Sequence, residues 1–367
     1  MFIDIETPSV VIDVEKVKKN ISEMASSVSS NNCTLRPHIK THKIPELAKL
    51  QIENGSTGIT CAKVSEAEVM ADAGISDIFL AYPTVGNYRV ERALELSKRV
   101  RLILGVDSIE GAQILSSAVV KKNIDCEVRL EIDTGLRRTG IQYDKAVDAA
   151  KIIAKLPGIS LTGIFTFRGL SLDGKKTDKF IDAGVDEGEK ISAIATLIRN
   201  NGINIKDVSC GSTPTGKYAA GVDGVTEVRP GTYIFNDIMQ VKSRVAKAEE
   251  CAASVLVTVI STPYEDTAIV DGGSKAISTD TTTGVFPFFF EGYGKIVGRD
   301  NLILAHANEE HGIIKSNSGG TGLRIGDRLL IIPNHICTTI NLHDHVYFLN
   351  ADNSLRKVCV EARGKLY

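Results

Sequence analysis

The feature that most constrains the fold is an eightfold alternation of short apolar runs and longer amphipathic stretches between residues 34 and 233. The short runs are rich in β-branched and apolar residues, whereas the stretches between them carry apolar residues at helical spacing. Repeated eight times, this pattern predicts a TIM-like (β/α)8 barrel. The predicted strands are 34–40, 58–63, 77–82, 101–106, 126–132, 161–167, 207–211 and 227–233.

A doubly wound open sheet is the main alternative, but no Gly-x-Gly-x-x-Gly turn follows the first predicted strand. After residue 236 the pattern changes to β-rich runs separated by Gly, Asp and Asn, at 254–261, 268–270, 294–297, 327–332 and 345–349. We therefore predict two domains. The barrel covers 14–235, and an all-β domain is formed by 1–13 and 236–367.

Composition argues against several classes of protein. The chain has 43 Lys and Arg against 45 Asp and Glu, a net charge of −2, so we expect no nucleic-acid partner. Its apolar stretches are shorter than the roughly 20 residues of a membrane span, and its first residues lack a basic signal region. We expect a cytoplasmic protein that does not bind membranes. Seven scattered cysteines without a Cys-x-x-Cys pair argue against a disulfide framework.

Lys40 is the first candidate for chemistry. It ends the first predicted strand in the sequence Arg-Pro-His-Ile-Lys-Thr-His-Lys, and polar residues at the carboxyl ends of barrel strands are typical of active sites. Neighbouring cations and desolvation lower the pKa of a lysine and favour a Schiff-base amine. The alternative is a solvated basic turn.

Two further motifs point to a phosphate and a metal. Gly211, Ser212 and Thr213 follow the seventh strand, where barrels often bind phosphate, although Gly-Ser-Thr-Pro is also common turn chemistry. His335 and Cys337 are two residues apart on a predicted strand, so their side chains share a face and can ligate one cation. Imidazole with thiolate favours zinc, and two ligands leave positions open for water or substrate. Two core residues without a metal are the alternative.

Six ordered motifs together carry a resemblance. They are Arg-Pro-His-x-Lys-Thr-His-Lys, Asp-x-Gly-x-x-Arg-x-Gly, Gly-Ser-Thr-Pro-Thr, Arg-Pro-Gly-Thr-Tyr, Asp-Gly-Gly-Ser-Lys-Ala and Pro-Asn-His-x-Cys. From Thr7 to about Asp344 the chain resembles the D-serine dehydratase and D-threonine aldolase family, pyridoxal-phosphate enzymes of the alanine racemase fold type.

The resemblance implies a role for each candidate residue. Lys40 is similar to the Schiff-base lysine of the family, Gly211 to Thr213 to its phosphate loop, and Arg138 and Tyr233 to neighbours of the cofactor. His335 and Cys337 are similar to its metal pair, which implies a divalent metal, with zinc favoured, and a homodimer is also implied. The expected partner is a small D-amino acid substrate.

The His-x-Cys pair resembles the dehydratases, whereas the aldolases tend to place aspartate at the second position. The resemblance therefore implies dehydration of a D-3-hydroxy amino acid to a 2-oxo acid and ammonia. Aldol cleavage to glycine and an aldehyde, racemisation, and a non-catalytic cofactor carrier are the alternatives. Phe167 and Leu170 replace polar residues usual in the family, and the first of these is usually tyrosine. We therefore expect a substrate other than D-serine, with Arg168 meeting an acidic side chain.

Overall fold

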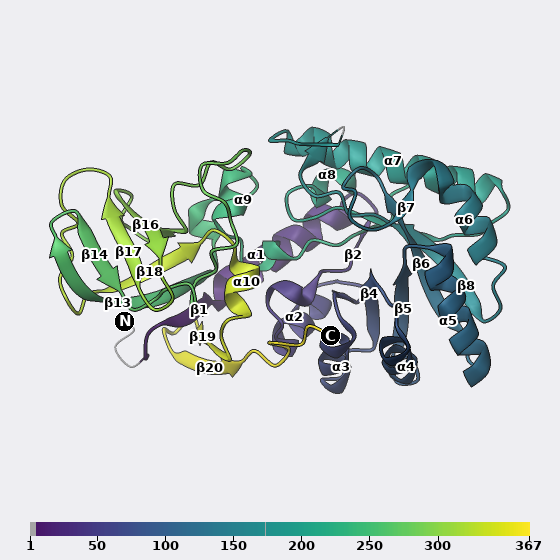
Figure 1. Cartoon of the computed structure of the whole chain (residues 1–367), viewed down its shortest axis with the longest axis horizontal. Coiled ribbons are helices and arrows are strands. Elements are labelled where there is room, and N and C mark those ends of the chain that lie inside the picture. The colour runs from purple at the N-terminus through teal and green to yellow at the C-terminus, as the bar shows by residue number, and fades with distance from the viewer. Residues whose placement is uncertain (1–4, 173) are drawn as a thin grey trace. The chain divides into compact units, whose positions relative to one another are not determined.

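The protein is described by a computed structural model that covers residues 5–172 and 174–367 and divides into two compact units (Figure 1). The barrel unit contains Ser22–Lys40, Pro45–Gly231 and Lys365–Tyr367. The β unit contains the described part of Met1–Ile21, together with Thr41–Ile44 and Thr232–Gly364. The predicted limits of the functional domains stay predictions.

The barrel unit is built on eight parallel strands. Their order in the sheet is β2 (Thr34–Leu35), β12 (Glu227–Val228), β11 (Asp207–Cys210), β8 (Ile159–Phe165), β6 (Cys126–Asp133), β5 (Arg101–Val106), β4 (Asp77–Pro83) and β3 (Ile59–Cys61). A parallel bridge between His38 and Thr60 joins the segment after β2 to β3. The predicted fold class is confirmed, and each of the eight predicted strands overlaps an observed one.

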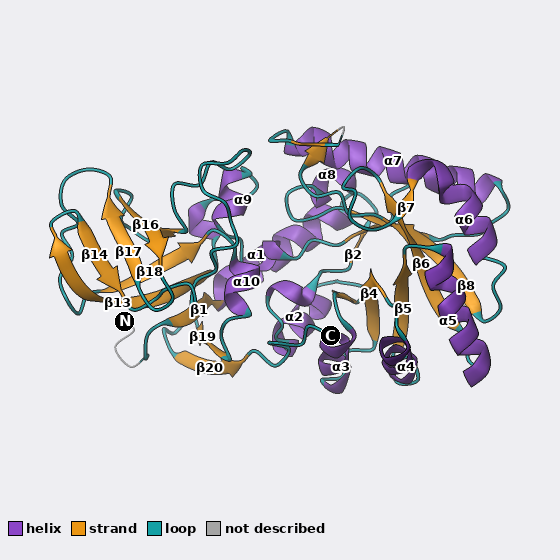
Figure 2. Cartoon of the chain, viewed as in Figure 1, coloured by secondary structure: helices purple, strands orange, loops and turns teal. Residues whose placement is uncertain are grey.

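Helices cover the outside of this sheet (Figure 2). In chain order they are α2 (Pro45–Glu53), α3 (Val64–Asp72), α4 (Asn87–Leu96), α5 (Ile109–Lys122), α6 (Ala146–Ile153), α7 (Phe180–Asn200) and α8 (Gly216–Ala219). Helix α1 (Val14–Ser29) contributes residues to both units. Two short additions lie beside the barrel strands, β7 (Ile141–Gln142) on β6 and the hairpin of β9 (Ser171–Leu172) with β10 (Lys175–Lys176).

The β unit holds a closed ring of strands, β14 (Thr267–Val270), β17 (Gly312–Ser316), β16 (Leu302–Ala307), β15 (Gly294–Ile296), β18 (Arg328–Pro333) and β13 (Ala253–Tyr264), which returns to β14. From β13 the sheet continues through β1 (Ser9–Asp13), β19 (His345–Leu349) and β20 (Leu355–Cys359). The unit also contains the short helices α9 (Ile238–Lys242) and α10 (Ile336–Ile340). The all-β prediction is confirmed, although it missed β16, β17 and β20.

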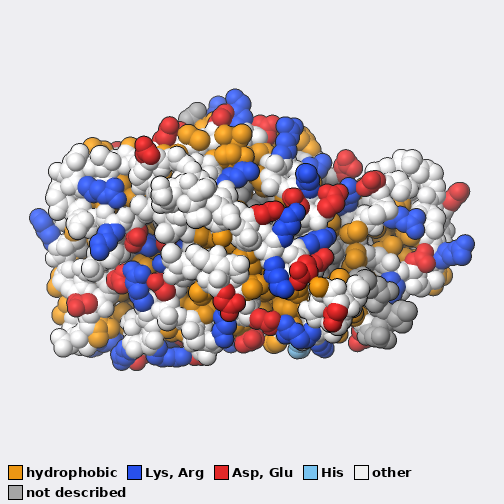
Figure 3. Space-filling view, turned by 180° about the vertical axis from the view of Figure 1, so that it is seen from behind, with side chains coloured by type: hydrophobic (Ala, Val, Ile, Leu, Met, Phe, Trp, Pro, Cys, Tyr) orange, Lys and Arg blue, Asp and Glu red, His pale blue; other side chains and the backbone are white. Residues whose placement is uncertain are grey.

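The surface agrees with the near-zero net charge. On the face drawn in Figure 3, Lys and Arg side chains are interspersed with Asp and Glu. None of the helices in the described parts of the chain is long and apolar enough to cross a lipid bilayer.

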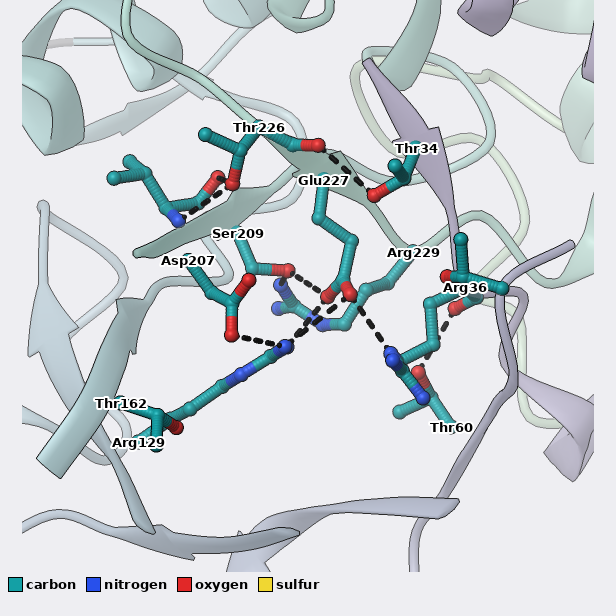
Figure 4. Close-up of polar contacts among 12 residues, drawn as sticks. Thr34, Arg36, Thr60, Arg129, Thr162, Asp207, Ser209, Thr226, Glu227 and Arg229 are labelled. Atoms are coloured by element: carbon teal, nitrogen blue, oxygen red, sulfur yellow. Dashed lines mark hydrogen bonds and ion pairs between the residues drawn. The ribbon is translucent and has the colours of Figure 1, made fainter. Parts of the chain in front are cut away.

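A buried carboxylate organises the interior of the barrel (Figure 4). Glu227 on β12 is 2 % exposed and accepts hydrogen bonds from Arg36 Nε at 2.7 Å and Arg129 Nη1 at 2.6 Å. Ser209 Oγ on β11 donates to the same carboxylate at 2.6 Å. Arg229 Nη1 in turn donates to Ser209 Oγ at 2.6 Å. This network ties together β12, β6, β11 and the segment after β2.

The network also fixes the charge of Glu227. Burial alone would raise the pKa of Glu227, but the positive charges of Arg129 and Arg36 outweigh it and lower the pKa to about 2. The folded state therefore binds this proton less tightly than the unfolded chain does. The stabilisation by Glu227 is present above its ordinary pKa of 4.5 and is lost as the pH falls from there towards 2.

We expect Glu227→Gln to lower the free energy of unfolding at pH 7 by about 3–5 kcal/mol, because it removes the buried carboxylate shared by Arg36 and Arg129 and leaves these buried guanidinium groups only their partly exposed partners, Asp77 and Asp207. Urea titrations at several pH values measure this. Between pH 4.5 and 2 the variant should lose less stability than the wild type. Glu15→Gln, which removes an exposed partner of Lys18, is the control and should change stability by less than about 0.5 kcal/mol. Equal losses in both variants would contradict the role of Glu227.

Candidate active site

Lys40 lies just beyond the short strand β2. The predicted strand 34–40 is too long, because β2 ends at Leu35 and Lys40 belongs to a 3-10 turn, Ile39–Thr41. The Lys40 backbone N–H donates to His38 Nδ1 at 3.4 Å. Its side chain is exposed in the single chain, so the expected desolvation is not found there.

Lys40 and Arg138 meet around one aromatic ring. Lys40 Nζ lies 5.9 Å from the centre of the Phe167 ring, and the Arg138 guanidinium carbon lies 5.1 Å from it. Both distances are within the range of a cation–π contact. Phe167 follows β8, whereas Arg138 follows β6, so the barrel brings together residues far apart in the sequence. Phe167 thus lies within cation–π distance of two residues predicted to bind the cofactor.

The loop that carries Arg138 is held by its own backbone. Asp133 Oδ1 accepts hydrogen bonds from the N–H groups of Gly135 at 2.9 Å and Arg137 at 3.1 Å. Gly140 has a φ of +108°, and a Cβ there would lie 2.7 Å from the backbone nitrogen of Asp133. The loop borders a pocket of about 920 Å³, whose lining includes Arg137, Arg138, Tyr143 and Lys190.

The predicted phosphate loop follows β11. Gly211 has a φ of +79°, and a Cβ there would lie 2.8 Å from Gly216 Cα. The Gly216 N–H donates to the Ser212 carbonyl at 2.7 Å, and the Ser212 N–H donates to Thr215 Oγ1 at 3.0 Å. Thr213 is buried. The turn is therefore tight, and it requires glycine at 211 because of the positive φ and the close approach of the Gly216 backbone.

Tyr233 is buried, but not on a strand. Strand β12 ends at Val228, and Tyr233 lies in a 3-10 turn, Thr232–Ile234, that belongs to the β unit. The predicted strand 227–233 is therefore too long. The structure describes Lys40, Arg138 and Gly211 to Thr213 in the barrel unit, and Tyr233, His335 and Cys337 in the β unit.

His335 and Cys337 do not lie on a strand, so that prediction is wrong. Strand β18 ends at Pro333, His335 is the N-cap residue of α10, and Cys337 lies in its first turn. The chain turns because the buried side chain of Asn334 donates to the Gly292 carbonyl at 2.7 Å. Asp237 Oδ2 accepts from the backbone N–H of Ile336, between the two predicted ligands, at 3.0 Å.

The two side chains nevertheless act on one another. Burial disfavours the charged thiolate, yet the His335 imidazolium and its hydrogen bond lower the pKa of Cys337 below its ordinary value. Burial likewise disfavours the charged imidazole, but the Cys337 thiolate raises the pKa of His335. Cys337 Sγ lies 3.2 Å from Thr41 Oγ1 and 3.4 Å from Thr232 Oγ1.

This donor pair suits a soft or borderline divalent metal such as zinc, which binds thiolate and imidazole. In the parts of the chain that the structure describes, no group of three or more His, Cys, Asp and Glu side chains is placed to hold a metal. The pair therefore fits a site whose remaining positions are open, as catalytic metals require.

Arg168 is not available to a substrate. It is fully buried, pairs with Asp186, and donates from Nη2 to the Ala183 carbonyl at 2.8 Å. The expectation that it meets an acidic substrate is therefore wrong. Sequence reasoning also missed Asp237, whose role at Ile336 depends on a contact 99 residues away that no local pattern signals.

The comparisons with known proteins agree with this geometry. Residues 12–238 match the "Alanine racemase, N-terminal domain", and residues 252–349 match the "Putative serine dehydratase domain". The chain is 36 % identical to D-threo-3-hydroxyaspartate dehydratase of Delftia sp. strain HT23, with 96 % of each chain covered. The chain belongs to the D-serine dehydratase and D-threonine aldolase family.

Other members of the family are also similar. D-threonine aldolase of Arthrobacter sp. is 29 % identical, over 93 % of this chain and 88 % of that protein. A solved structure of D-threo-3-hydroxyaspartate dehydratase, a cysteine-to-alanine mutant in the metal-free form, superposes with a TM-score of 0.88 at 33 % identity. It covers 97 % of each chain. This chain is accordingly a pyridoxal-phosphate-dependent lyase.

We expect Gly211→Ala to destabilise the protein and to weaken pyridoxal phosphate binding, because the new Cβ is strained and meets Gly216. Gly202→Ala is the matched control, since Gly202 has a similar φ of +81° but open space around its Cβ position. The backbone strain costs roughly 1–2 kcal/mol in either variant. Gly211→Ala also meets Gly216, so its loss of unfolding free energy, measured in urea, should exceed that of the control. Only Gly211→Ala should weaken cofactor binding, measured by absorbance titration. Equal effects would show that the close approach at Gly211 has no role.

Proposed function

We propose that this lyase dehydrates a D-3-hydroxy amino acid to a 2-oxo acid and ammonia. The observation that carries the proposal is the pair formed by the His335 imidazole and the Cys337 thiol. The pKa of the Cys337 thiol is lowered, which favours the thiolate, the form that binds a metal. A metal-free cysteine mutant of the related dehydratase supports a metal at such a pair. The D-amino acid substrates named for the relatives support the substrate class.

Residues of the barrel unit, together with Tyr233 of the β unit, fit pyridoxal phosphate. We assign Lys40 as the Schiff-base lysine, Gly211, Ser212 and Thr213 to the phosphate, and Arg138 and Tyr233 to the neighbourhood of the cofactor ring. The tight turn at Gly211, after a barrel strand, supports the phosphate assignment, and the Phe167 ring, within cation–π distance of both Lys40 and Arg138, supports the other. When bound, the cofactor supplies an electron sink for the pair left at Cα.

The chain's own groups then move the protons. Lys40 Nζ, once the substrate's amino group has taken its place, accepts the proton from Cα. His335 and Cys337 would hold a divalent metal, zinc in our assignment, which would supply Lewis acidity for departure of the β-hydroxyl. Loss of that hydroxyl as water leaves an enamine, and its hydrolysis yields the 2-oxo acid and ammonia.

We also propose an acidic substrate, such as D-threo-3-hydroxyaspartate. Arg137 and Arg138 line the 920 Å³ pocket beside the loop 133–140, and guanidinium groups pair well with carboxylates. The similarity to D-threo-3-hydroxyaspartate dehydratase supports the same choice. Phe167 in place of a phenol is in keeping with a substrate other than D-serine.

Aldol cleavage is the second candidate, because a D-threonine aldolase is among the relatives. It would use the same residues but remove the proton from the β-hydroxyl and break the Cα–Cβ bond. A racemase would leave the metal pair without a purpose, and a cofactor carrier would not require the β unit. A homodimer in the cytoplasm completes the proposal, on the strength of the family resemblance.

Product analysis tests the reaction. The protein loaded with pyridoxal phosphate and zinc is incubated with D-threonine, which can be either dehydrated or cleaved. We expect ammonia with 2-oxobutanoate, whereas glycine with acetaldehyde would assign the chain to the aldolases. D-threo-3-hydroxyaspartate and D-serine, compared by kcat/KM, should favour the acidic substrate. Preference for D-serine would contradict the role given to the pocket.

Lys40→Ala tests the lysine assignment. We expect the variant to lose the yellow chromophore and all turnover, because no amine remains to hold the cofactor aldehyde. The visible spectrum after gel filtration measures this, with Lys43→Ala as the control, since Lys43 is a neighbouring lysine in the sequence. A Lys40→Ala protein that stays yellow and active would contradict the assignment of Lys40 as the Schiff-base lysine.

A further inference from the structure

One carboxylate outside the predicted site contacts a predicted metal ligand. Asp280 lies in the long connection between β14 and β15, 55 residues before His335 in the chain. Its Oδ2 lies 2.7 Å from His335 Nδ1, the nitrogen nearer the backbone. Both residues belong to the β unit.

The position of Asp280 is fixed by a circuit of hydrogen bonds. Ser278 Oγ donates to Asp280 Oδ1 at 2.9 Å, and the Ser278 N–H donates to Thr339 Oγ1 at 3.2 Å. Thr339 Oγ1 donates to the His335 carbonyl at 2.9 Å, which closes the circuit on the histidine itself. Both carboxylate oxygens of Asp280 are therefore engaged, one by Ser278 and the other by His335.

This arrangement determines which imidazole nitrogen is free for a metal. When a metal displaces one proton of the imidazolium, a carboxylate that accepts from Nδ1–H keeps the remaining proton on that nitrogen, so that Nε2 offers its lone pair to the metal. The imidazole also hydrogen-bonds the Cys337 side chain, so the ring already faces the second donor. We infer that Asp280 is the positioning residue of the metal pair, presenting Nε2 of His335 beside Cys337 Sγ. The inference rests on the proposed metal function of that pair.

Two other interpretations of Asp280 fit less well. A solvated ion pair on the surface would need no support, yet Asp280 and His335 are only 40 % and 27 % exposed and are linked through Ser278 and Thr339. A third metal ligand would have to join His335 and Cys337 around one ion, whereas in the described parts of the chain no group of three or more His, Cys, Asp and Glu side chains is placed to hold a metal.

The test measures metal affinity directly, by chelator competition on the cofactor-loaded protein. Removing an orienting carboxylate typically weakens metal binding about 10- to 100-fold, and we expect this for Asp280→Ala. Ser278→Ala, which frees Asp280 on one side, should weaken binding by a smaller factor. Asp300→Ala removes an exposed partner of Lys295 in the same unit and should leave metal affinity unchanged.

Cobalt substitution separates orientation from ligation. The absorption bands of Co²⁺ depend on its ligands, so they should keep their positions in Asp280→Asn if the carboxylate is not a ligand. The thiolate-to-cobalt band should persist in Asp280→Ala and disappear in Cys337→Ala. Bands that move in Asp280→Asn would show that Asp280 binds the metal itself and would overturn the inference.

The outcomes distinguish the inference from the function on which it rests. If Asp280→Ala binds zinc as tightly as the wild type while Cys337→Ala loses it, the metal pair stands and the positioning role fails. If Cys337→Ala also retains zinc, the metal pair itself is wrong and both proposals fall. A folded Asp280→Ala protein with full cofactor content, weakened zinc binding and a normal Asp300→Ala control supports both.

Discussion

The ion pairs of Glu227 hold the barrel where its backbone ladder is thinnest. Strands β2 and β12 each have only two residues, so few hydrogen bonds join them to their neighbours. Glu227 binds Arg36 from one side and Arg129 from the other, so a side chain supplies the connection that longer strands would make with their backbones. A buried ion-pair network of this kind is stable only because every charge in it has a partner. Single substitutions of its residues should therefore destabilise the barrel.

The position of Lys40 depends on this arrangement. Arg36, fixed by Glu227 and by Asp77 on β4, lies four residues before Lys40. The His38 N–H donates to the Pro230 carbonyl, and the Thr60 N–H donates to the Pro37 carbonyl. These backbone hydrogen bonds attach the segment to both of its neighbours where the barrel closes. Parallel strands bring their carboxyl ends to one rim, so the loops after β6, β8 and β11 share that rim. Ion pairs inside the barrel thus set the backbone that presents the proposed catalytic amine.

Much of the fold follows from local patterns in the sequence. Strands such as β5 and β19 were predicted residue for residue, because apolar runs between polar segments leave few alternatives. β20 was missed because a short run with two charged residues, Leu355–Cys359, resembles a loop. The ends of β2 and β12 were placed too late, since the segments 36–40 and 229–233 that follow them lead into turns that only tertiary contacts define.

The site was less predictable than the fold. Lys40 and the His-x-Cys pair stand out in the sequence through their motifs, but the helix N-terminus at His335 depends on Asn334 reaching Gly292. Asp280 and Asp237 act across 55 and 99 residues, and isolated aspartates in loops carry no local signal. Residues that position others are therefore visible only when the chain is folded.

The loop from Asp133 to Gly140 has a consequence for the energetics of recognition. Its conformation is set by the Asp133 carboxylate and by the contact of Gly140 with the backbone, both of which exist without a ligand. The entropic cost of ordering this loop is therefore incurred when the barrel folds and not when a substrate binds. A pre-organised loop of this kind improves affinity without new contacts, and in the proposed function it would make its arginines selective for the shape of an anionic substrate as well as its charge.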